Sequence, residues 1–486
     1  MIVKDKIDDL LYQVSKPERY IGNEWNQIVK DWSANKTKVV FSFPDVYEIG
    51  MSHLGLKLLY HKLNQEQNIL CERAFAPWPD LEELLREKDI SLFSLETKHE
   101  LKDFDIIGFT LQYEMSYTNI INMLDLAGIP IYSQKRNEDT PLVIAGGSTV
   151  FNPEPLASFI DVFFIGEAET SIVNLVNTYQ KFVDKGWNRK KILKNLNQIR
   201  GVYVPSLYEI TYFNSGAVKE FKPESSEIKT EIKRQLVSNL DQAFYPTDFI
   251  VPYMDIVHNR AVLEIARGCT RGCRFCSAGI TYRPVRERKP ETIINLDDQI
   301  LESTGLDEIS LSSLSTVDYS DIRNLVTTMA DRYKEDKISI ALPSLRIDDF
   351  SVELAHEVQK VRKSGLTLAP EAGTQRLRDV INKGVDEKDL YQAVRAAFES
   401  GWSRIKLYFM IGLPTETRKD LAGIVEMADK VKQIGSEIRG KRVDVNVSIS
   451  TFVPKPFTPF QWVKMIDKQT IIEKQSYLRD NIRGKG

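Results

Sequence analysis

The segment AVLEIARGCTRGCRFCSAG, residues 261–279, decides how the second half of the chain is interpreted. It begins as an apolar, β-branched run and passes through Arg267-Gly268 into three cysteines, Cys269, Cys273 and Cys276. The remaining cysteine, Cys71, lies far upstream and is interpreted as a small buried residue. Three thiols on a glycine-rich loop directly after a strand are typical of a metal site rather than of a disulfide framework.

The cysteine spacing is C-x3-C-x2-C, with Phe275 directly before the last cysteine. This differs from the paired C-x2-C knuckles of structural zinc and from the C-x2-C-x2-C run of ferredoxins. It resembles the signature of the radical S-adenosylmethionine (SAM) superfamily. The resemblance implies that the three cysteines hold a [4Fe-4S] cluster and leave one iron open for SAM. Two alternatives are a zinc site completed by Cys71 or a histidine, and three structural cysteines without a metal.

The composition is that of an ordinary globular protein. The chain has 486 residues, of which 42% are hydrophobic and 27% charged, and its formal net charge is −3. This length predicts roughly three domains, and the charge argues against a generally cationic nucleic-acid-binding protein. The N-terminal residues lack the apolar core of a signal peptide, and no apolar run approaches the length of a membrane span. With so few cysteines, these features predict a cytoplasmic protein.

The first half of the chain predicts a doubly wound, Rossmann-like domain at residues 38–182, preceded by an N-terminal extension at 1–37. The strand candidates begin at Lys38 and continue with 105–111, 141–147 and 161–168. They are nearly continuous apolar runs that alternate with helical stretches, which indicates a parallel sheet covered on both faces. Residues 183–250 are predicted to form a connector with a small hairpin at 201–213.

This domain resembles the cobalamin-binding module that is fused to many radical SAM enzymes. That module often carries D-x-H-x-x-G after its first strand, and its histidine binds cobalt; here residues 45–50 are DVYEIG. Because Tyr47 takes the histidine position, histidine ligation there is ruled out. The resemblance implies cobalamin contacts at Asp45, Tyr47, Gly50, Gly146 and Gly147. His53 is interpreted as a capping or packing residue, and both bound cobalamin and a vestigial module stay open.

The second domain, at residues 251–462, is predicted to be a partial (β/α)6 barrel of the TIM type, followed by a helical tail at 463–486. After the cysteine strand, the strand candidates are 308–314, 337–346, 365–373, 404–414 and 444–454. Helical stretches lie between them, so the whole chain is expected to be an α/β protein. Ligands of such barrels gather at the carboxyl ends of the strands.

The radical SAM resemblance implies SAM contacts at these strand ends. The expected contacts are Phe275, Ile411 and Gly412 for the adenine, Ser312 and Ser313 for the amino group, Ser344 and Glu371 for the ribose, and Arg346 for the carboxylate. Arg346 is equally well interpreted as part of a rim salt bridge, and Glu416 as a cap of the next helix. Six arginines crowd the cysteine region and are mostly interpreted as solvated, with an anionic partner open for the others. They are Arg267, Arg271, Arg274, Arg283, Arg286 and Arg288.

The resemblance implies an enzyme that passes one electron from a flavodoxin or ferredoxin type donor into SAM and releases a 5′-deoxyadenosyl radical, which attacks a substrate. Three hypotheses stay open. The first is cobalamin-dependent methyl transfer, and the second is a radical SAM enzyme with a vestigial first domain that modifies RNA, protein or a metabolite. The third is a non-catalytic iron–sulfur or zinc scaffold. RNA stays uncertain because methylthiotransferases share this domain order but add an RNA-binding β-barrel that is not recognised here.

Three further segments resemble one uncharacterised family of radical SAM proteins with a cobalamin-binding module. They are PDVYEIGMSHLG (44–55), APEAGTQRLR (369–378) and PKPFTPFQW (454–462). Members of that family are expected to continue past the last of these segments, so the sequence is expected to be a shortened form. The substrate and the oligomeric state are not predicted.

Overall fold

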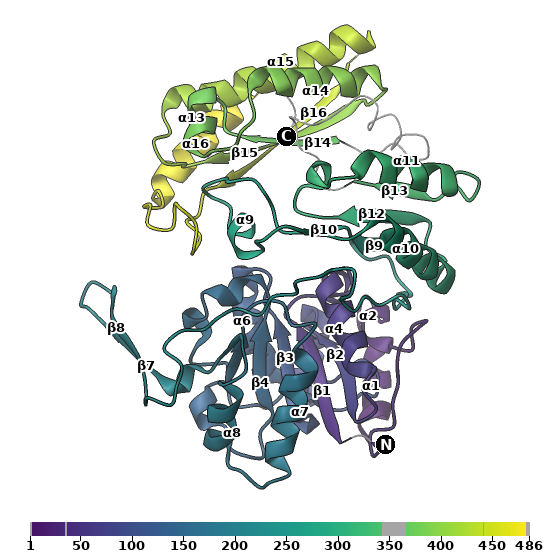
Figure 1. The fold of residues 1–486 in the computed structure, drawn as a ribbon, viewed down its shortest axis with the longest axis vertical. Coiled ribbons are helices and arrows are strands. Elements are labelled where there is room, and N and C mark those ends of the chain that lie inside the picture. The colour runs from purple at the N-terminus through teal and green to yellow at the C-terminus, as the bar shows by residue number, and fades with distance from the viewer. Residues whose placement is uncertain (1, 35, 343–365, 441, 483–486) are drawn as a thin grey trace. The chain divides into compact units, whose positions relative to one another are not determined.

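The computed structural model describes residues 2–34, 36–342, 366–440 and 442–482. Their contacts divide the chain into two compact units, which are described separately here (Figure 1). Unit 1 contains Met1–Asn259 together with Glu302–Gly305, and unit 2 contains Arg260–Leu301 and Leu306–Gly486. The division at Asn259 lies a few residues after the boundary that we predicted between residues 250 and 251.

Unit 1 is built on a six-stranded sheet in the order β2-β1-β3-β4-β5-β6. The strands are β1 (Thr37–Phe43), β2 (Ile69–Phe75), β3 (Ile106–Thr110), β4 (Leu142–Gly146), β5 (Val162–Phe164) and β6 (Val202–Tyr203). The first five strands are parallel, and β6 joins β5 antiparallel. The strand order reverses between β1 and β3, and ligands bind at such reversal points in open α/β sheets. The predicted doubly wound domain is confirmed.

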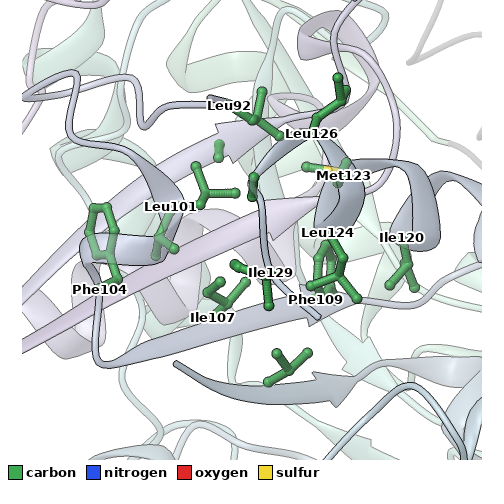
Figure 2. Close-up of a cluster of buried hydrophobic side chains, with 14 of the residues drawn as sticks. Leu92, Leu101, Phe104, Ile107, Phe109, Ile120, Met123, Leu124, Leu126 and Ile129 are labelled. Atoms are coloured by element: carbon green, nitrogen blue, oxygen red, sulfur yellow. The ribbon is translucent and has the colours of Figure 1, made fainter. Parts of the chain in front are cut away.

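Helices cover both faces of this sheet because successive residues of a strand point to opposite sides. In β1, Val39, Phe41 and Phe43 belong to one buried cluster, whereas Val40 belongs to the other. The first cluster includes residues of α4 (Leu54–Asn64), α7 (Ile172–Val183) and α8 (Arg189–Leu196). The second includes residues of α1 (Ile2–Leu11), α5 (Pro79–Glu87) and α6 (Tyr117–Leu126). Figure 2 shows part of the second cluster, which contains Ile107 and Phe109 of β3 and Met123 and Leu124 of α6.

Strand β2 was not predicted, because its sequence ILCERAF carries two charged residues. Both Glu72 and Arg73 are buried in unit 1. The Arg73 guanidinium pairs with Glu24 at 2.9 Å and with Glu96 at 2.6 Å, which satisfies the charge that burial would otherwise penalise. Glu24 lies in the segment that we predicted as an N-terminal extension. Because α1 of the same segment contributes Ile7 and Leu10 to the core, this segment is part of unit 1.

The predicted connector at 183–250 also belongs to unit 1, since α8 joins one helical layer and β6 joins the sheet. The hairpin is formed by β7 (Tyr208–Tyr212) and β8 (Val218–Pro223), so the predicted range 201–213 contains only its first strand. Figure 1 shows this hairpin projecting from unit 1. Two single-turn helices, α2 (Glu18–Ile21) and α3 (Tyr47–Gly50), complete the unit.

Unit 2 contains two three-stranded parallel sheets, in the orders β13-β12-β9 and β14-β15-β16. The strands are β9 (Ala261–Glu264), β12 (Glu308–Ser312), β13 (Ser339–Ala341), β14 (Leu366–Glu371), β15 (Arg404–Ile411) and β16 (Asp444–Thr451). The helices α10 (Pro290–Thr304), α11 (Ile322–Arg332), α14 (Glu387–Glu399) and α15 (Arg418–Arg439) alternate with them. This alternation confirms the predicted partial barrel, while the helical stretch expected between the strand candidates 337–346 and 365–373 lies outside the described residues.

The core of the second sheet comes from alternate residues of its strands. In β15, Ile405, Leu407, Phe409 and Ile411 are buried, and they pack with residues of α14 and α15. The tail predicted at 463–486 forms α16 (Lys468–Asn481), whose Leu478 is buried in the same core. None of the helices in the part of the chain that the structure describes combines the length and apolar character that a membrane crossing requires.

Candidate functional site

The three cysteines lie on a loop whose ends are tied together at its base. The short strand β10 (Ala266–Arg267) enters the loop, β11 (Arg286–Glu287) leaves it, and the two pair antiparallel. Gly268 follows β10 with φ +96°, and a Cβ there would lie 2.7 Å from the carbonyl oxygens of Tyr282 and Pro284. Only glycine fits such a close approach in this backbone conformation, so the strand–glycine–cysteine order has a steric cause.

Contacts from both sheets of unit 2 hold the outer part of this loop. The guanidinium of Arg271 donates to the carboxylate of Asp318 at 3.0 and 2.5 Å, and Asp318 follows β12. The backbone N–H of Arg274 donates to the carbonyl of Ile381 at 2.9 Å, just after α13 (Gln375–Val380), which itself follows β14. Paired charge-assisted bonds fix geometry better than single neutral ones. The cysteines therefore lie on a fixed frame.

The four cysteines are all within the described residues and none forms a disulfide. Cys269, Cys273 and Cys276 are partly exposed, whereas Cys71 is buried, and burial raises the pKa of the Cys71 thiol well above its ordinary value. The backbone N–H of Gly279, in α9 (Ala278–Thr281), donates to Cys276 Sγ at 3.4 Å. Among the described residues, no group of histidines, cysteines and acids could hold a single metal ion. Three thiols on one short loop do fit the donor set of an iron–sulfur cluster.

An apolar cluster lies next to the cysteine loop. Phe275 packs against it, together with Met410 and Val463. The buried members are Ala372, Leu377, Ile381, Leu413, Phe452 and Phe460. They follow the carboxyl ends of β14, β15 and β16, where barrels of this type bind ligands. The loop and the turn after β15, both expected at the SAM adenine, therefore share one apolar environment.

The turn after β15 depends on Gly412, which has φ +79°. Its N–H donates to Glu416 Oε2 at 3.0 Å, and the buried Glu416 carboxylate also pairs with Lys474 of α16. Our expectation that Glu416 caps the next helix is wrong, because Thr417 and Asp420 form the capping box of α15.

Glu371 ends β14 in the left-handed region, with φ +68°, which residues other than glycine seldom adopt. The pairing register of β14 with β15 shifts between Leu368 and Glu371. Burial raises the pKa of the Glu371 carboxyl, and Lys383 at 3.4 Å opposes that rise. Backbone strain of this kind collects at functional sites.

The other expected SAM contacts are described only in part. Ser312 ends β12, and its carbonyl accepts from the N–H of Ile265 at 3.0 Å. The hydroxyl of Ser313 shares a hydrogen bond with that of Thr316 at 3.0 Å. Both serines thus lie at the strand end next to the cysteine strand. Ser344 and Arg346 lie outside the described residues.

The six arginines near the cysteines serve the geometry of the loop, and our expectation that most are solvated is wrong. Arg267 pairs with Glu264 at 2.7 Å, and the buried Arg286 and Arg288 donate to backbone carbonyls. Arg271, Arg274 and Arg283 donate to Asp318 and to carbonyls of Val380 and Arg271 respectively. Of these contacts, the sequence could have indicated the pair of Arg267 with Glu264, three residues before it, but not the bonds to backbone carbonyls.

Two of the implied cobalamin contacts are instead packing residues of unit 1. The Tyr47 side chain is only 1% exposed, and its hydroxyl donates to Glu24 at 2.9 Å. A Cβ at Gly50 would lie 2.3 Å from the ring of Phe75. His53 caps α4 by accepting from the N–H of Leu56 at 3.2 Å, which confirms its capping interpretation. Burial lowers the pKa of His53 to about 4.

The other implied positions do lie at the carboxyl edge of the sheet. Asp45 follows β1 and accepts from the N–H of Val46 at 2.8 Å. Gly146 ends β4, and Gly147 has φ +119°, where a Cβ would lie 2.3 Å from the carbonyl oxygen of Leu111. The large apolar side chains exposed after β1 and β3 are Ile49, Tyr113 and Met115. This edge has the apolar character that a large planar ligand needs.

Comparison with known proteins gives the class of this chain. Residues 55–205 match the family model described as radical SAM proteins, N-terminal, and residues 263–428 match that of the radical SAM superfamily. An uncharacterised protein of Methanocaldococcus jannaschii is 30% identical over 424 residues, which cover 87% of this chain and 79% of that protein. The chain belongs to the radical SAM superfamily, whose members use a [4Fe-4S] cluster and SAM, as the cysteine motif predicted.

Two solved structures show which radical SAM enzymes share the fold of this chain. The radical SAM methyltransferase TsrM from Kitasatospora setae, with cobalamin and a [4Fe-4S] cluster bound, superposes with TM-score 0.55 and 15% identity over 87% of this chain and 77% of that one. The cobalamin-dependent SAM radical enzyme OxsB, with aqua-cobalamin and SAM bound, gives TM-score 0.58 and 15% identity over 91% of this chain and 61% of that one. At this identity the likeness establishes the fold, which is that of cobalamin-dependent radical SAM enzymes.

Proposed function

We propose that this protein is an enzyme that cleaves SAM reductively at a [4Fe-4S] cluster held by Cys269, Cys273 and Cys276. The main support for the proposal is the cysteine loop itself. It carries three partly exposed thiols, and its two ends come together at the close backbone contact of Gly268. When bound, the cluster supplies the electron that breaks a carbon–sulfur bond of SAM and yields a 5′-deoxyadenosyl radical.

The side chains around the loop bind and orient SAM in this proposal. Phe275 and the turn at Ile411-Gly412 offer an apolar surface to the adenine. The Glu371 carboxylate offers acceptors to the ribose hydroxyls, and Ser313 offers one to the ammonium group. A flavodoxin or ferredoxin type protein is the proposed electron donor, and the apolar cluster keeps water from the reacting atoms.

The test is anaerobic reconstitution with iron and sulfide, followed by measurement of 5′-deoxyadenosine formed from SAM and dithionite. We expect product from the wild type and none from Cys273→Ala. Cys71→Ala is the matched control, because Cys71 is buried in unit 1, and it should keep product formation. A wild type that forms a complete cluster but no 5′-deoxyadenosine would favour the scaffold hypothesis, and zinc in place of iron would contradict the proposal.

We further propose that the carboxyl edge of unit 1 binds cobalamin and that the reaction transfers a methyl group. The reversal of strand order between β1 and β3 and the exposed Ile49, Tyr113 and Met115 support this site. When bound, cobalamin supplies the methyl group. Because Tyr47 is buried, its side chain is not available to cobalt. In this proposal the exposed Ile49, Tyr113 and Met115 therefore make the main contacts with cobalamin.

Cobalt retained after incubation with hydroxocobalamin and gel filtration tests this second proposal. Met115→Glu should lower retention, since Met115 is 72% exposed and a carboxylate there opposes an apolar ligand. Val183→Glu is the matched control, because Val183 is exposed at the end of α7, whose carboxyl end lies at the opposite edge of a doubly wound sheet. A wild type that retains no cobalt would favour the vestigial-domain hypothesis, in which RNA, protein or a metabolite is modified without cobalamin.

A further inference from the structure

Helix α16, which we predicted only as a tail, takes part in the turn that follows β15. Lys474 of α16 forms an ion pair with Glu416, which in turn accepts the N–H of Gly412 at 3.0 Å. The Glu416 side chain is 2% exposed and that of Lys474 is 17% exposed, so the pair is largely removed from water. The ion pair thus joins two residues that are 58 positions apart, and through Glu416 it is linked to the backbone N–H of Gly412.

The packing of α16 explains why Lys474 reaches Glu416. Leu478, four residues further along, is buried in the core of the β14–β16 sheet. Because helical residues four apart share a face, burial of Leu478 turns Lys474 toward the same sheet. Arg418 of α15 lies 5.3 Å from the ring centroid of Tyr477, which gives the two helices a second link.

Ile466, just before α16, supports the turn from another direction. A Cβ at Gly412 would lie 2.6 Å from Ile466 Cδ1, so the isoleucine side chain packs directly on the glycine. The turn at 411–416 is therefore fixed by a hydrogen bond to Glu416, by the charge of Lys474 and by the bulk of Ile466. Two of these three supports come from the segment at 463–486.

We propose that Lys474 is a positioning residue for SAM. Acting through Glu416, it fixes the N–H of Gly412 and so the turn that offers Ile411 and Gly412 to the adenine. This inference rests on the proposed function, because the adenine contact is part of that proposal. Removing the cation leaves a buried carboxylate unpaired, which is strongly unfavourable. Glu416 would then turn toward water and release the N–H of Gly412, while the cysteine loop keeps its own contacts.

Hydrogen exchange tests the positioning without any cofactor. In the full chain, Lys474→Met should speed exchange in the peptide 405–417 at least about tenfold, whereas Lys474→Arg should restore protection. Lys468→Met is the matched control, since Lys468 is an exposed lysine of the same helix for which the described residues show no ion pair. Unchanged exchange in Lys474→Met overturns the proposal, as does faster exchange spread evenly over unit 2, which would indicate a general loss of stability.

The SAM dissociation constant of the reconstituted protein tests the functional part. We expect Lys474→Met to weaken SAM binding about tenfold, the lower end of what loss of a supporting contact costs at metal sites, with unchanged cluster absorbance. Equal SAM affinity in the wild type and Lys474→Met overturns the role of Lys474 alone. A wild type without SAM affinity overturns the proposed function and this role together, so the two failures are distinguishable.

Discussion

The two units differ in how far the residues of their sequence motifs are buried. In unit 1, the DVYEIG segment after β1 turns into the core, where Tyr47 bonds to Glu24 and Gly50 packs on Phe75. In unit 2, the three clustered cysteines and Glu371 stay partly exposed after the ends of strands. The cysteine loop is held by the bond from Arg271 to Asp318, and Glu371 is held by its ion pair with Lys383. A motif residue is accessible to a ligand only where the fold leaves one side of it open.

The units also differ in how they bury charge. Unit 1 pairs two buried acids, Glu24 and Glu96, with Arg73. Unit 2 buries Asp297 on α10 with neither oxygen hydrogen-bonded in the described part of the chain, since the Tyr333 hydroxyl donates to Asp298 instead. Unit 1 thus uses its buried charge to join segments, whereas unit 2 keeps a buried acid that burial holds in its protonated form below about pH 7.

The largest expected effect is that of Arg73→Met, which leaves two buried carboxylates without their cation. We expect the free energy of unfolding of unit 1 to fall by about 3–5 kcal/mol, measured by urea titration with hydrogen exchange read on unit 1 peptides. Arg86→Met is the control, because the Arg86 pairs are exposed and such pairs contribute about 1 kcal/mol or less. Similar losses in both variants would contradict a structural role for the buried network.

Asp297 should make the stability of unit 2 depend on pH. Burial raises the pKa of its carboxyl to about 7, so the folded chain binds this proton more tightly than the unfolded chain, in which aspartate titrates near 4. The contribution of Asp297 to the free energy of unfolding is therefore largest below about pH 4 and falls as the pH rises toward 7, by about 4 kcal/mol.

Asp297→Asn should remove this pH dependence, as measured by urea unfolding of unit 2 peptides between pH 4 and pH 8. Asp298→Asn is the matched control, because Asp298 is partly exposed and paired with Arg332. A pH profile that Asp297→Asn leaves unchanged would show that the carboxyl finds a partner on folding.

Two glycines sharpen the contrast within unit 1. Gly50→Ala forces a methyl group against Phe75 and should cost about 1–3 kcal/mol of stability. At Gly146 the nearest atom to an added Cβ is 3.8 Å away, so Gly146→Ala should change stability by less than about 0.5 kcal/mol. Thermal denaturation compares the two, and cobalt retention shows whether Gly146→Ala blocks a ligand. Equal stability in both variants would contradict a packing role for Gly50.

A small effect is expected for His53→Ala, which removes the cap of α4 and should cost about 1 kcal/mol. Asparagine also caps helices, so His53→Asn should keep most of this stability. Because the pKa of His53 is lowered to about 4, the wild type loses stability as the pH falls from about 6.5 to 4, and His53→Ala should lose that dependence. Cobalt retention that falls in both variants would instead indicate a ligand role for His53.

The sequence predicted correctly those features that depend on the spacing of hydrophobic residues and on glycines within one short segment. The alternating strands and helices, the cysteine loop and the cap at His53 follow from neighbouring residues. It was not informative where distant charges meet. Strand β2 was missed because its polar Arg73 pairs with Glu24 and Glu96, which lie outside the strand. Glu416 was assigned to a helix cap because its partner Lys474 lies 58 residues further along the chain.

The antiparallel strand β6 sets the time at which unit 1 can be completed during synthesis. Four of the parallel strands are available once Gly146 has been made, but the last edge of the sheet is covered only when Val202 and Tyr203 arrive. At about 5–20 residues per second, that interval is on the order of three to ten seconds. The main segment of unit 1 ends at Asn259, before Cys269, so the six-stranded sheet can be completed before the three clustered cysteines are made, and only Glu302–Gly305 of unit 1 is added later.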